Sequence, residues 1–341
     1  MPKFVLSKEK VLERFDFVSS MCDLVSYSSK TNPLVTEILD EERKCMFSIH
    51  LRNELVNVRE KDKVFFLAQG WTVSEVEELV SMGVEWFCVD NDKDLEVFME
   101  VLEKNSKKLN LFLRLKLKEH SLKTERYFVF GFSSRKVNSL VKSLRSNGKV
   151  GNLGVHFHRK TQNMAEWNLV SEISSVLSEE CLQSLDYVNI GGGLPSEYAN
   201  TNVKVVDTVV AKIKEFRVWL DSKGVKMVIE PGRFICAPAV KLVCKVLRVY
   251  DNNIVVDASV YNTDMDALIV PVKLLVEGEL ERGKGEAYVI KGVTPCSMDL
   301  FRYRVYLNKV EEGSEIVFLN AGAYNFSTSF CDLGVVETEI E

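Results

Sequence analysis

Eight short apolar segments, separated by stretches with helical periodicity, constrain the fold of this chain more than any other feature. In one such stretch Thr72 or Ser74 can cap a helix that places Val76 and Leu79 on one face. Several of the segments are apolar throughout, which is typical of parallel strands with both faces buried. Eight strand–helix units predict a closed (β/α)8 barrel. The expected strands are Leu24–Ser28, Cys45–Ile49, Val64–Leu67, Trp86–Val89, Leu111–Leu115, Leu153–Phe157, Tyr187–Ile190 and Lys226–Ile229.

The pattern changes after Pro231, where apolar strands follow one another without long helices between them. This succession predicts an all-β domain of the sandwich or barrel-like type. We expect the barrel to span residues 7–236 and the β domain to span 237–341, with residues 1–6 added to it as a strand. The strands expected in the β domain are Lys3–Leu6, Val240–Val249, Ile254–Asp257, Ala267–Val276, Ala287–Lys291 and Ile316–Leu319.

Composition excludes several classes of protein. The net charge of -5 over 341 residues gives no electrostatic basis for binding nucleic acid. No apolar run is long enough to cross a bilayer, and the first 15 residues lack the features of a signal peptide, so we expect a cytoplasmic protein that does not bind membranes. The eight cysteines form no CxxC pair and mostly lie in apolar runs, which indicates reduced core residues and no metal site.

Charged and small residues follow the ends of the expected barrel strands. Barrel active sites lie at the carboxyl ends of the strands, so side chains that follow different strands converge on one rim. Any one of these residues alone would more often be structural, but their shared position favours function. The residues are Lys30, Arg114, His158, Gly191, Gly192, Gly193, Glu230 and Arg233.

This combination of groups suits pyridoxal 5'-phosphate (PLP). A lysine amine can form a Schiff base with the cofactor aldehyde, and a carboxylate can keep the pyridine nitrogen protonated. An imidazole can stack against the ring. A glycine loop lets backbone N–H groups approach the phosphate closely, and a nearby arginine adds a charged contact.

The same residues lie within a set of ordered sequence motifs. YSSKTNP (27–33), GVHFH (154–158), NIGGGLP (189–195), EPGRF (230–234), PCSMD (295–299) and NAGAYNF (320–326) occur in this order. The chain thereby resembles the fold-type III PLP decarboxylases, which include ornithine, lysine, arginine and diaminopimelate decarboxylases. The resemblance extends from about residue 3 to about residue 330. It implies an alanine-racemase-like barrel, PLP as cofactor and α-decarboxylation of an amino acid.

The resemblance also implies roles for individual residues. Lys30 is similar to the lysine that binds the cofactor, His158 to the ring-stacking histidine and Glu230 to the partner of the pyridine nitrogen. Cys296 resembles a catalytic cysteine that a partner subunit inserts into the active site, which implies a homodimer with shared sites. The expected phosphate ligands are Gly191, Gly192, Gly193, Arg233 and Tyr324, and the other residues expected at the cofactor are Glu54 and Arg114.

The substrate-binding segments depart from the family pattern. Arg159-Lys160-Thr161 replaces a glycine-serine stretch, and Thr161 is the candidate to replace the serine as a phosphate ligand. Ser297 stands where ornithine and diaminopimelate decarboxylases carry an acid. The spacing Cys-x-x-Asp resembles carboxynorspermidine decarboxylase, so Asp299, assisted by Asp266, is the candidate for binding a distal ammonium group.

Three interpretations remain open at this point. The first is a decarboxylase acting on a diamino acid or polyamine precursor, either ornithine-, lysine- or arginine-like or carboxynorspermidine-like. The second is an amino-acid racemase on the same fold, although no tyrosine stands out as a second base. The third is an inactive regulatory homologue, which would be expected to lack Lys30, Glu230 or Cys296. Because all three residues are present, we favour the decarboxylase.

Overall fold

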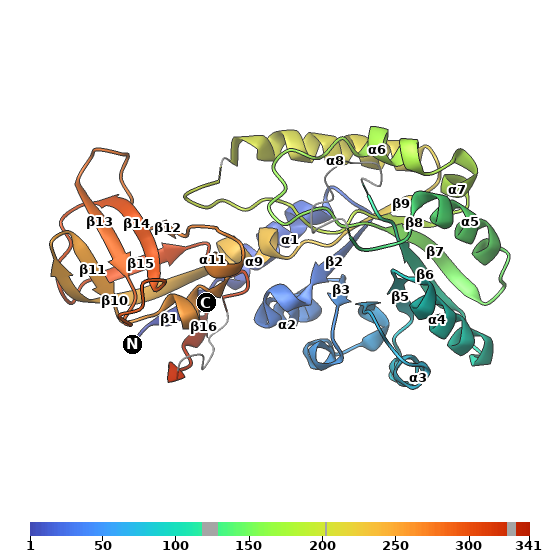
Figure 1. The fold of residues 1–341 in the computed structure, drawn as a ribbon, viewed down its shortest axis with the longest axis horizontal. Helices are drawn as coiled ribbons and strands as arrows, with labels where there is room; N and C mark the ends of the chain where they lie inside the picture. Colours follow the sequence, from blue (N-terminus) through green and yellow to red (C-terminus); the bar gives the residue numbers. More distant parts are fainter. Residues whose placement is uncertain (118–128, 202, 326–331) are drawn as a thin grey trace. The chain divides into compact units, whose positions relative to one another are not determined.

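The computed structural model describes residues 1–117, 129–201, 203–325 and 332–341. Residue contacts divide the chain into two compact units (Figure 1). We call Phe15–Pro195 with Lys204–Gly232 the barrel unit, and Met1–Arg14 with Ser196–Val203 and Arg233–Glu341 the β unit. Cys331 lies outside the described residues. No helix within the described ranges combines the length and apolarity needed to cross a membrane.

Eight parallel strands close the barrel, as the sequence predicts. Each strand pairs with the next in the chain, and β2 closes the ring by pairing Leu24 with Val228 of β9. The strands are β2 (Leu24–Ser28), β3 (Met46–Ile49), β4 (Val64–Leu67), β5 (Trp86–Val89), β6 (Leu109–Arg114), β7 (Val150–His156), β8 (Tyr187–Asn189) and β9 (Lys226–Ile229).

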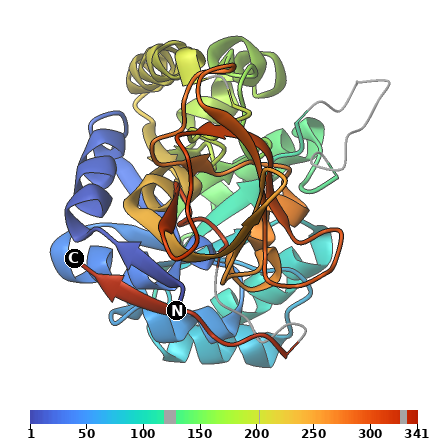
Figure 2. The same cartoon turned by 90° about the vertical axis from the view of Figure 1, so that its left-hand side faces the viewer.

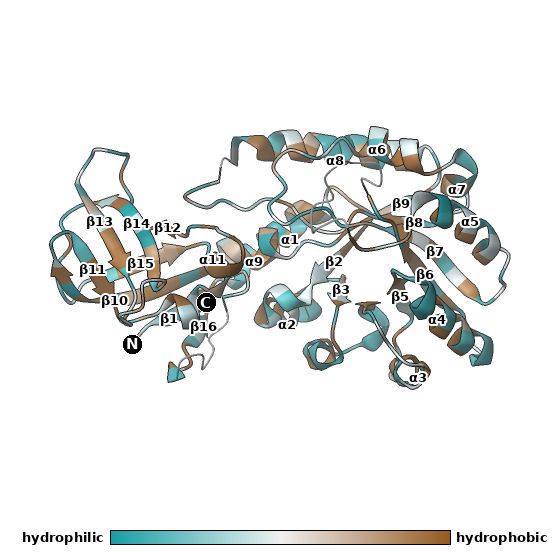
Figure 3. Ribbon diagram, in the orientation of Figure 1, coloured by the Kyte–Doolittle hydropathy of each residue, from teal (hydrophilic) through white to brown (hydrophobic). Residues whose placement is uncertain are grey.

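Helices separate the barrel strands along the sequence. Thr72 caps α3 and exchanges bonds with Glu75 in a capping box, and Asn91 caps α4 through the N–H of Asp94. Figure 3 shows hydrophilic residues on α4 and hydrophobic residues along β6. The helices are α1 (Lys8–Ser19), α2 (Pro33–Glu42), α3 (Val73–Ser81), α4 (Asp92–Lys104), α5 (Ser134–Arg145), α6 (Leu169–Val176), α7 (Glu179–Gln183) and α8 (Val206–Asp221).

Large apolar side chains fill the barrel interior. Met46, Phe65, Cys88 and Phe112 form one buried cluster, in which the rings of Phe65 and Phe112 meet edge to face with centroids 4.8 Å apart. Gly154 makes room for this packing, because a Cβ there would lie 2.5 Å from a ring carbon of Phe112. The filled core leaves the strand ends as the place for a site.

The β unit contains one eight-stranded sheet. The first strand pairs antiparallel with β10 and parallel with β16, so both chain ends lie in this sheet (Figure 2). The strands are β1 (Lys3–Leu6), β10 (Val240–Tyr250), β11 (Asn253–Val256), β12 (Leu275–Val276), β13 (Glu286–Lys291), β14 (Leu300–Leu307), β15 (Glu315–Leu319) and β16 (Glu337–Ile340). Three short helices accompany them: α9 (Arg233–Cys236), α10 (Val260–Thr263) and α11 (Met265–Ile269).

The predicted strand Ala267–Val276 is wrong. Its first residues belong to helix α11, and only Leu275–Val276 forms a strand. The side chain of Asn325 accepts a bond from the Asp266 N–H in the first turn of that helix, and Pro271 follows its end, where a proline cannot donate a ladder bond. The sequence prediction also omitted strands β14 and β16.

Candidate active site

The barrel unit brings most of the predicted site residues to the carboxyl ends of its strands. Lys30 follows β2 in a short 3-10 helix (Ser29–Thr31), and Arg114 is the last residue of β6. The pKa of Lys30 is lowered chiefly by burial and further by the charge of Arg114, whereas Glu54 and Glu230 oppose this effect. The side chain of Lys30 nevertheless remains accessible to solvent. A lysine with a lowered pKa is more often neutral and nucleophilic.

Glu230 follows β9 and lies in a cage of hydrogen-bond donors. Its Oε1 accepts bonds from Ser48 (2.8 Å) and Asn189 (3.0 Å), and its Oε2 lies 3.1 Å from Nε2 of His156. Burial would raise the pKa of this carboxyl, but His156 and then Ser48 lower it to about 2. The barrel thus holds a buried carboxylate that stays ionised at neutral pH.

Sequence reasoning identified Glu230 but missed the three residues that surround it. Ser48 lies within β3, His156 and Asn189 are the last residues of β7 and β8, and all three are buried. A polar residue in such a position needs a hydrogen-bond partner, because leaving it unsatisfied costs free energy. That signal was available in the sequence and could have indicated a shared acceptor.

The glycine loop after β8 contacts the histidine after β7. The N–H of Gly192 donates to Nδ1 of His158 at 3.2 Å, so the ring proton of the neutral imidazole lies on Nε2. Burial and the charge of His156 lower the pKa of His158 to about 3. Gly191 and Gly193 have positive φ angles of 66° and 99°. A Cβ on either would lie within 2.6 Å of a main-chain oxygen, so the loop requires glycine.

Glu54 and His50 present polar atoms that lack partners. Glu54 Oε1 accepts the backbone N–H groups of His50 (3.1 Å) and Leu51 (2.9 Å). Glu54 Oε2 and His50 Nδ1 are buried and have no hydrogen-bond partner within the described residues. Burial raises the pKa of Glu54, and burial together with the charge of Lys30 lowers the pKa of His50 to about 3. Unsatisfied buried atoms beside a lysine favour a bound ligand.

A cavity of about 600 Å³ opens beside these groups. His50 and Arg114 form part of its polar wall, and Trp71 and Phe130 part of its apolar wall. The guanidinium carbon of Arg114 lies 4.8 Å from the centre of the Phe130 ring. His50 and Arg114, which line this cavity, both interact electrostatically with Lys30.

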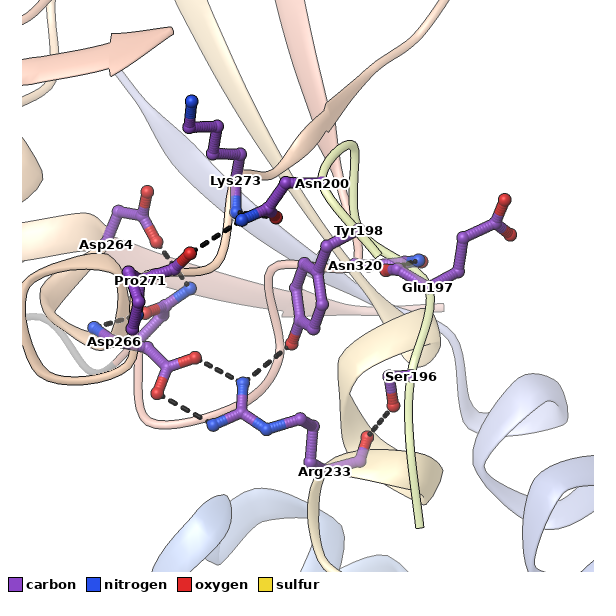
Figure 4. A network of polar contacts seen from close by, with 11 residues as sticks. Ser196, Glu197, Tyr198, Asn200, Arg233, Asp264, Asp266, Pro271, Lys273 and Asn320 are labelled. Atoms are coloured by element: carbon purple, nitrogen blue, oxygen red, sulfur yellow. Dashed lines mark hydrogen bonds and ion pairs between the residues drawn. The ribbon is translucent and has the colours of Figure 1, made fainter. Parts of the chain in front are cut away.

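Arg233 and Asp266 form a buried ion pair in the β unit (Figure 4). Nη1 and Nη2 of Arg233 both donate to the Asp266 carboxylate, and Nη1 also donates to the hydroxyl of Tyr198 at 2.8 Å. The ring centre of Tyr324 lies 5.6 Å from the guanidinium carbon. Arg233 and Tyr324 are thus neighbours, while Asp266 is already neutralised by an arginine. The phosphate role of Arg233 and the substrate role of Asp266 stay predictions.

The loop with Cys296 also lies in the β unit. Cys296 and Ser297 are exposed, whereas Asp299 is 2% exposed. Asp299 accepts bonds from Val260 N–H (2.8 Å) and from both the N–H (3.0 Å) and hydroxyl (2.7 Å) of Thr294. Asp299 therefore holds the loop together, and its predicted role in substrate binding stays a prediction. Thr161 lies in a turn after β7, and its predicted role is likewise untested.

The residues of the barrel unit fit PLP. Lys30 offers an amine of lowered pKa, and Glu230 offers an ionised carboxylate for the ring nitrogen. His158 offers a neutral ring, and the loop of Gly191 and Gly193 leaves no room for side chains, as close approach to a phosphate requires.

Comparison with known proteins supports this fit. Residues 9–237 match the family described as "Pyridoxal-dependent decarboxylase, pyridoxal binding domain". The chain is 24% identical to a diaminopimelate decarboxylase of Aquifex aeolicus, over 96% of this chain and 83% of the relative. It is 25% identical to the 2-[(L-alanin-3-ylcarbamoyl)methyl]-2-hydroxybutanedioate decarboxylase of Staphylococcus aureus, over 79% and 74% of the two chains.

A solved structure shares the fold. The lysine/ornithine decarboxylase of Vibrio vulnificus, complexed with cadaverine, superimposes with a TM-score of 0.82 at 21% identity, covering 100% of this chain and 94% of the other. The family match covers well over half of the 341 residues. The chain therefore belongs to the pyridoxal-dependent decarboxylases, carboxy-lyases that use PLP as their cofactor.

Proposed function

We propose that this enzyme removes the α-carboxyl group, as CO2, from a diamino acid or a related polyamine precursor. The observation that carries the proposal is the joint position of Lys30 and Glu230 at the barrel mouth, where the two charges influence each other. When bound, PLP supplies an electron sink for the electron pair that the departing CO2 leaves behind. The other contributions come from the side chains of this chain.

Each barrel residue has a distinct part in this proposal. Lys30 would hold the cofactor, and its lowered pKa favours the neutral, nucleophilic form of the amine. Glu230 stays ionised and would serve as the partner of the ring nitrogen, while His156 fixes the carboxylate. His158 would offer the ring a neutral imidazole, and Arg114 lines the neighbouring cavity.

The remaining assignments rest on the family resemblance. Gly191, Gly192 and Gly193 would hold the phosphate, together with Thr161, Arg233 and Tyr324. Cys296 of the partner subunit would give a proton to the carbon that has lost CO2, with Ser297 beside it. This arrangement requires a homodimer with shared sites.

Spectroscopy and labelling test the cofactor assignment. We expect purified protein with PLP to be yellow, and borohydride reduction to fix the cofactor on the peptide containing Lys30. Lys30→Ala should abolish both the colour and the label, whereas Lys160→Ala should keep them. A label on another lysine would contradict the assignment of Lys30.

Mixed dimers test the shared site. Lys30→Ala and Cys296→Ala subunits, each nearly inactive, should together regain about a quarter of the wild-type activity, because half of the dimers are mixed and each then has one intact site. Activity that does not rise on mixing would show that each site is built from one subunit.

The contacts of Asp266 and Asp299 within the β unit favour a second class of substrate. Asp266 already pairs with Arg233, and Asp299 already accepts three bonds, so a distal ammonium would have to compete with these partners for either carboxylate. Arg114, whose charge acts on Lys30, lines the cavity of about 600 Å³. An amino acid with distal carboxylates, like the one named for the Staphylococcus aureus relative, would suit such a cavity.

A substrate panel separates the two classes. CO2 release should be measured with ornithine, lysine, arginine, diaminopimelate, carboxynorspermidine and 2-[(L-alanin-3-ylcarbamoyl)methyl]-2-hydroxybutanedioate. The highest kcat/KM with a diamine precursor supports the first class, and Arg114→Gln should then leave KM nearly unchanged. The highest value with the tricarboxylic compound, together with a raised KM in Arg114→Gln, supports the second.

A further inference from the structure

Cys296 differs from the other cysteines in the described part of the chain. It is exposed, whereas Cys22 and Cys45 are typical of the six that are buried. Burial raises the pKa of Cys22 and Cys45 to about 12, so these thiols are inert at neutral pH. Among the described cysteines, Cys296 is therefore the one whose thiol can react at neutral pH.

The hydroxyl of Tyr261 lies 2.6 Å from the sulfur of Cys296. Tyr261 belongs to helix α10, which Ser259 caps through the Tyr261 N–H. The tyrosine is half-buried, so its ring position is defined by the helix. The contact thus joins an exposed thiol on one loop to a hydroxyl that a separate helix holds in place.

Asp299 connects the two segments that carry this pair. Its Oδ1 accepts the N–H of Val260, the residue before Tyr261, and its Oδ2 accepts the N–H and hydroxyl of Thr294. The Thr294 hydroxyl in turn accepts the N–H of Cys296 at 3.4 Å. One buried carboxylate therefore fixes helix α10 and the cysteine loop to each other.

The groups that act on the thiol have opposing effects. The hydrogen bond from Tyr261 is the largest influence and lowers the pKa of Cys296, and the backbone N–H groups of Met298 and Asp299 act in the same direction. Burial, and then the charge of Asp299, raise the pKa of Cys296 and so act against them. A hydrogen bond donated to sulfur stabilises the thiolate over the thiol.

We infer that Tyr261 is a positioning residue that holds Cys296 and stabilises its thiolate, and that Asp299 keeps these two residues in contact. The inference rests on the proposed function in one respect, the use of Cys296 as the proton donor. In that step the S–H bond breaks, the proton forms a C–H bond with the electron pair left by CO2, and the S–H electrons remain on sulfur. The Tyr261 hydroxyl then donates to the thiolate and is not itself consumed.

The rate of Cys296 alkylation as a function of pH tests the pair without any need for decarboxylation. Holoenzyme is treated with iodoacetamide from pH 6 to 10, and peptide-resolved mass spectrometry follows the Cys296 peptide alone. We expect Tyr261→Phe to slow alkylation by about threefold or more at pH 7 and to approach the wild-type rate at pH 10, because the thiolate fraction changes and the thiol remains accessible.

Tyr303→Phe is the matched control, because Tyr303 is an exposed tyrosine of β14 in the same unit. It should leave the profile unchanged. Asp299→Asn removes a charge that raises the pKa of Cys296, but the amide cannot accept all three bonds that hold helix α10 and the cysteine loop together. We expect the loss of these bonds to dominate, so the profile should shift in the same direction as in Tyr261→Phe. A profile for Tyr261→Phe that matches the wild type would overturn the inference, with circular dichroism confirming that the variant is folded.

Decarboxylation separates this inference from the proposed function. If Tyr261→Phe shifts the pH profile of alkylation but no substrate in the panel releases CO2, the proposed function fails, and the role of Tyr261 toward Cys296 is still supported. If the enzyme is active and its kcat shows the same pH displacement in Tyr261→Phe, both hold. If the enzyme is active but Tyr261→Phe changes neither the pH profile of kcat nor that of alkylation, the inference fails and the proposed function holds.

Discussion

Nε2 of His156 lies 3.1 Å from Oε2 of Glu230 inside the barrel, and this contact is the main reason that a buried carboxylate stays ionised. We predict that His156→Ala lowers the free energy of unfolding by about 1–3 kcal/mol, because it leaves a buried carboxylate oxygen without its donor. Urea denaturation at pH 7 measures the loss. A variant as stable as the wild type would show that the imidazole does not support Glu230.

The acid stability of the wild type should reflect the same carboxylate. The pKa of Glu230 falls from 4.5 to about 2 on folding, so its contribution is fully present above pH 4.5. That contribution is lost as the pH falls through about 2, where the folded protein takes up the proton. Glu230→Gln should remove this dependence, which urea titrations between pH 5 and 2 would detect.

The glycine after β8 gives a third prediction. Gly191→Ala should destabilise the protein by about 1–3 kcal/mol, because an alanine would need a positive φ and its Cβ would lie 2.5 Å from the Phe157 carbonyl oxygen. PLP affinity, followed by fluorescence, should fall as well. Gly148→Ala is the matched control, since a Cβ there meets nothing within 4 Å. If the two variants had equal stability and equal PLP affinity, the glycine loop after β8 would not be the phosphate site.

Histidine protonation gives a fourth prediction. The pKa of His158 falls from 6.5 to about 3 on folding, so between these values the unfolded chain binds one more proton than the folded protein. Stability should therefore fall as the pH is lowered from 6.5, by about 1.4 kcal/mol per pH unit for this histidine. His158→Gln should reduce the measured slope by that amount. An unchanged slope would mean that His158 titrates normally.

The ion pair in the β unit gives a fifth prediction. Asp266→Ala should cost about 3–5 kcal/mol, because it leaves Arg233 buried without its partner. Glu277→Ala, which removes the exposed partner of Lys241 in the same unit, should cost less than about 1 kcal/mol. If Asp266→Ala raises KM without any loss of stability, Asp266 binds substrate as the sequence suggested and the pair is not structural.

Hydrophobic pattern predicted the barrel well because its strands are buried on both faces. Val64–Leu67 and Trp86–Val89 are apolar throughout, and the structure has β4 and β5 at these bounds. The same rule failed in the β unit, where β14 carries Arg302. That arginine is buried, but it pairs with Glu279 and donates to the Leu274 carbonyl oxygen. A buried charge satisfied by distant residues cannot be recognised from the strand alone.

The site was predictable where chemistry is carried by single conspicuous residues. Lys30 and Glu230 follow strand ends, and the barrel places them near each other. The cage of Glu230 was not predicted, because His156, Ser48 and Asn189 come from three strands and meet only when the ring closes. The partner of Cys296 was missed for a similar reason, since Tyr261 lies 35 positions earlier in the chain.

The pairing of β1 with β10 and β16 has a consequence for the order of assembly during synthesis. The first strand leaves the ribosome before any of the barrel, yet both of its neighbours are made after the barrel is complete. A nascent chain must therefore keep the apolar segment β1 unpaired while the barrel forms, and the pairing of β1 is complete only after β16 has been made. Chains that stop short of β16 would expose that edge to other unfinished chains.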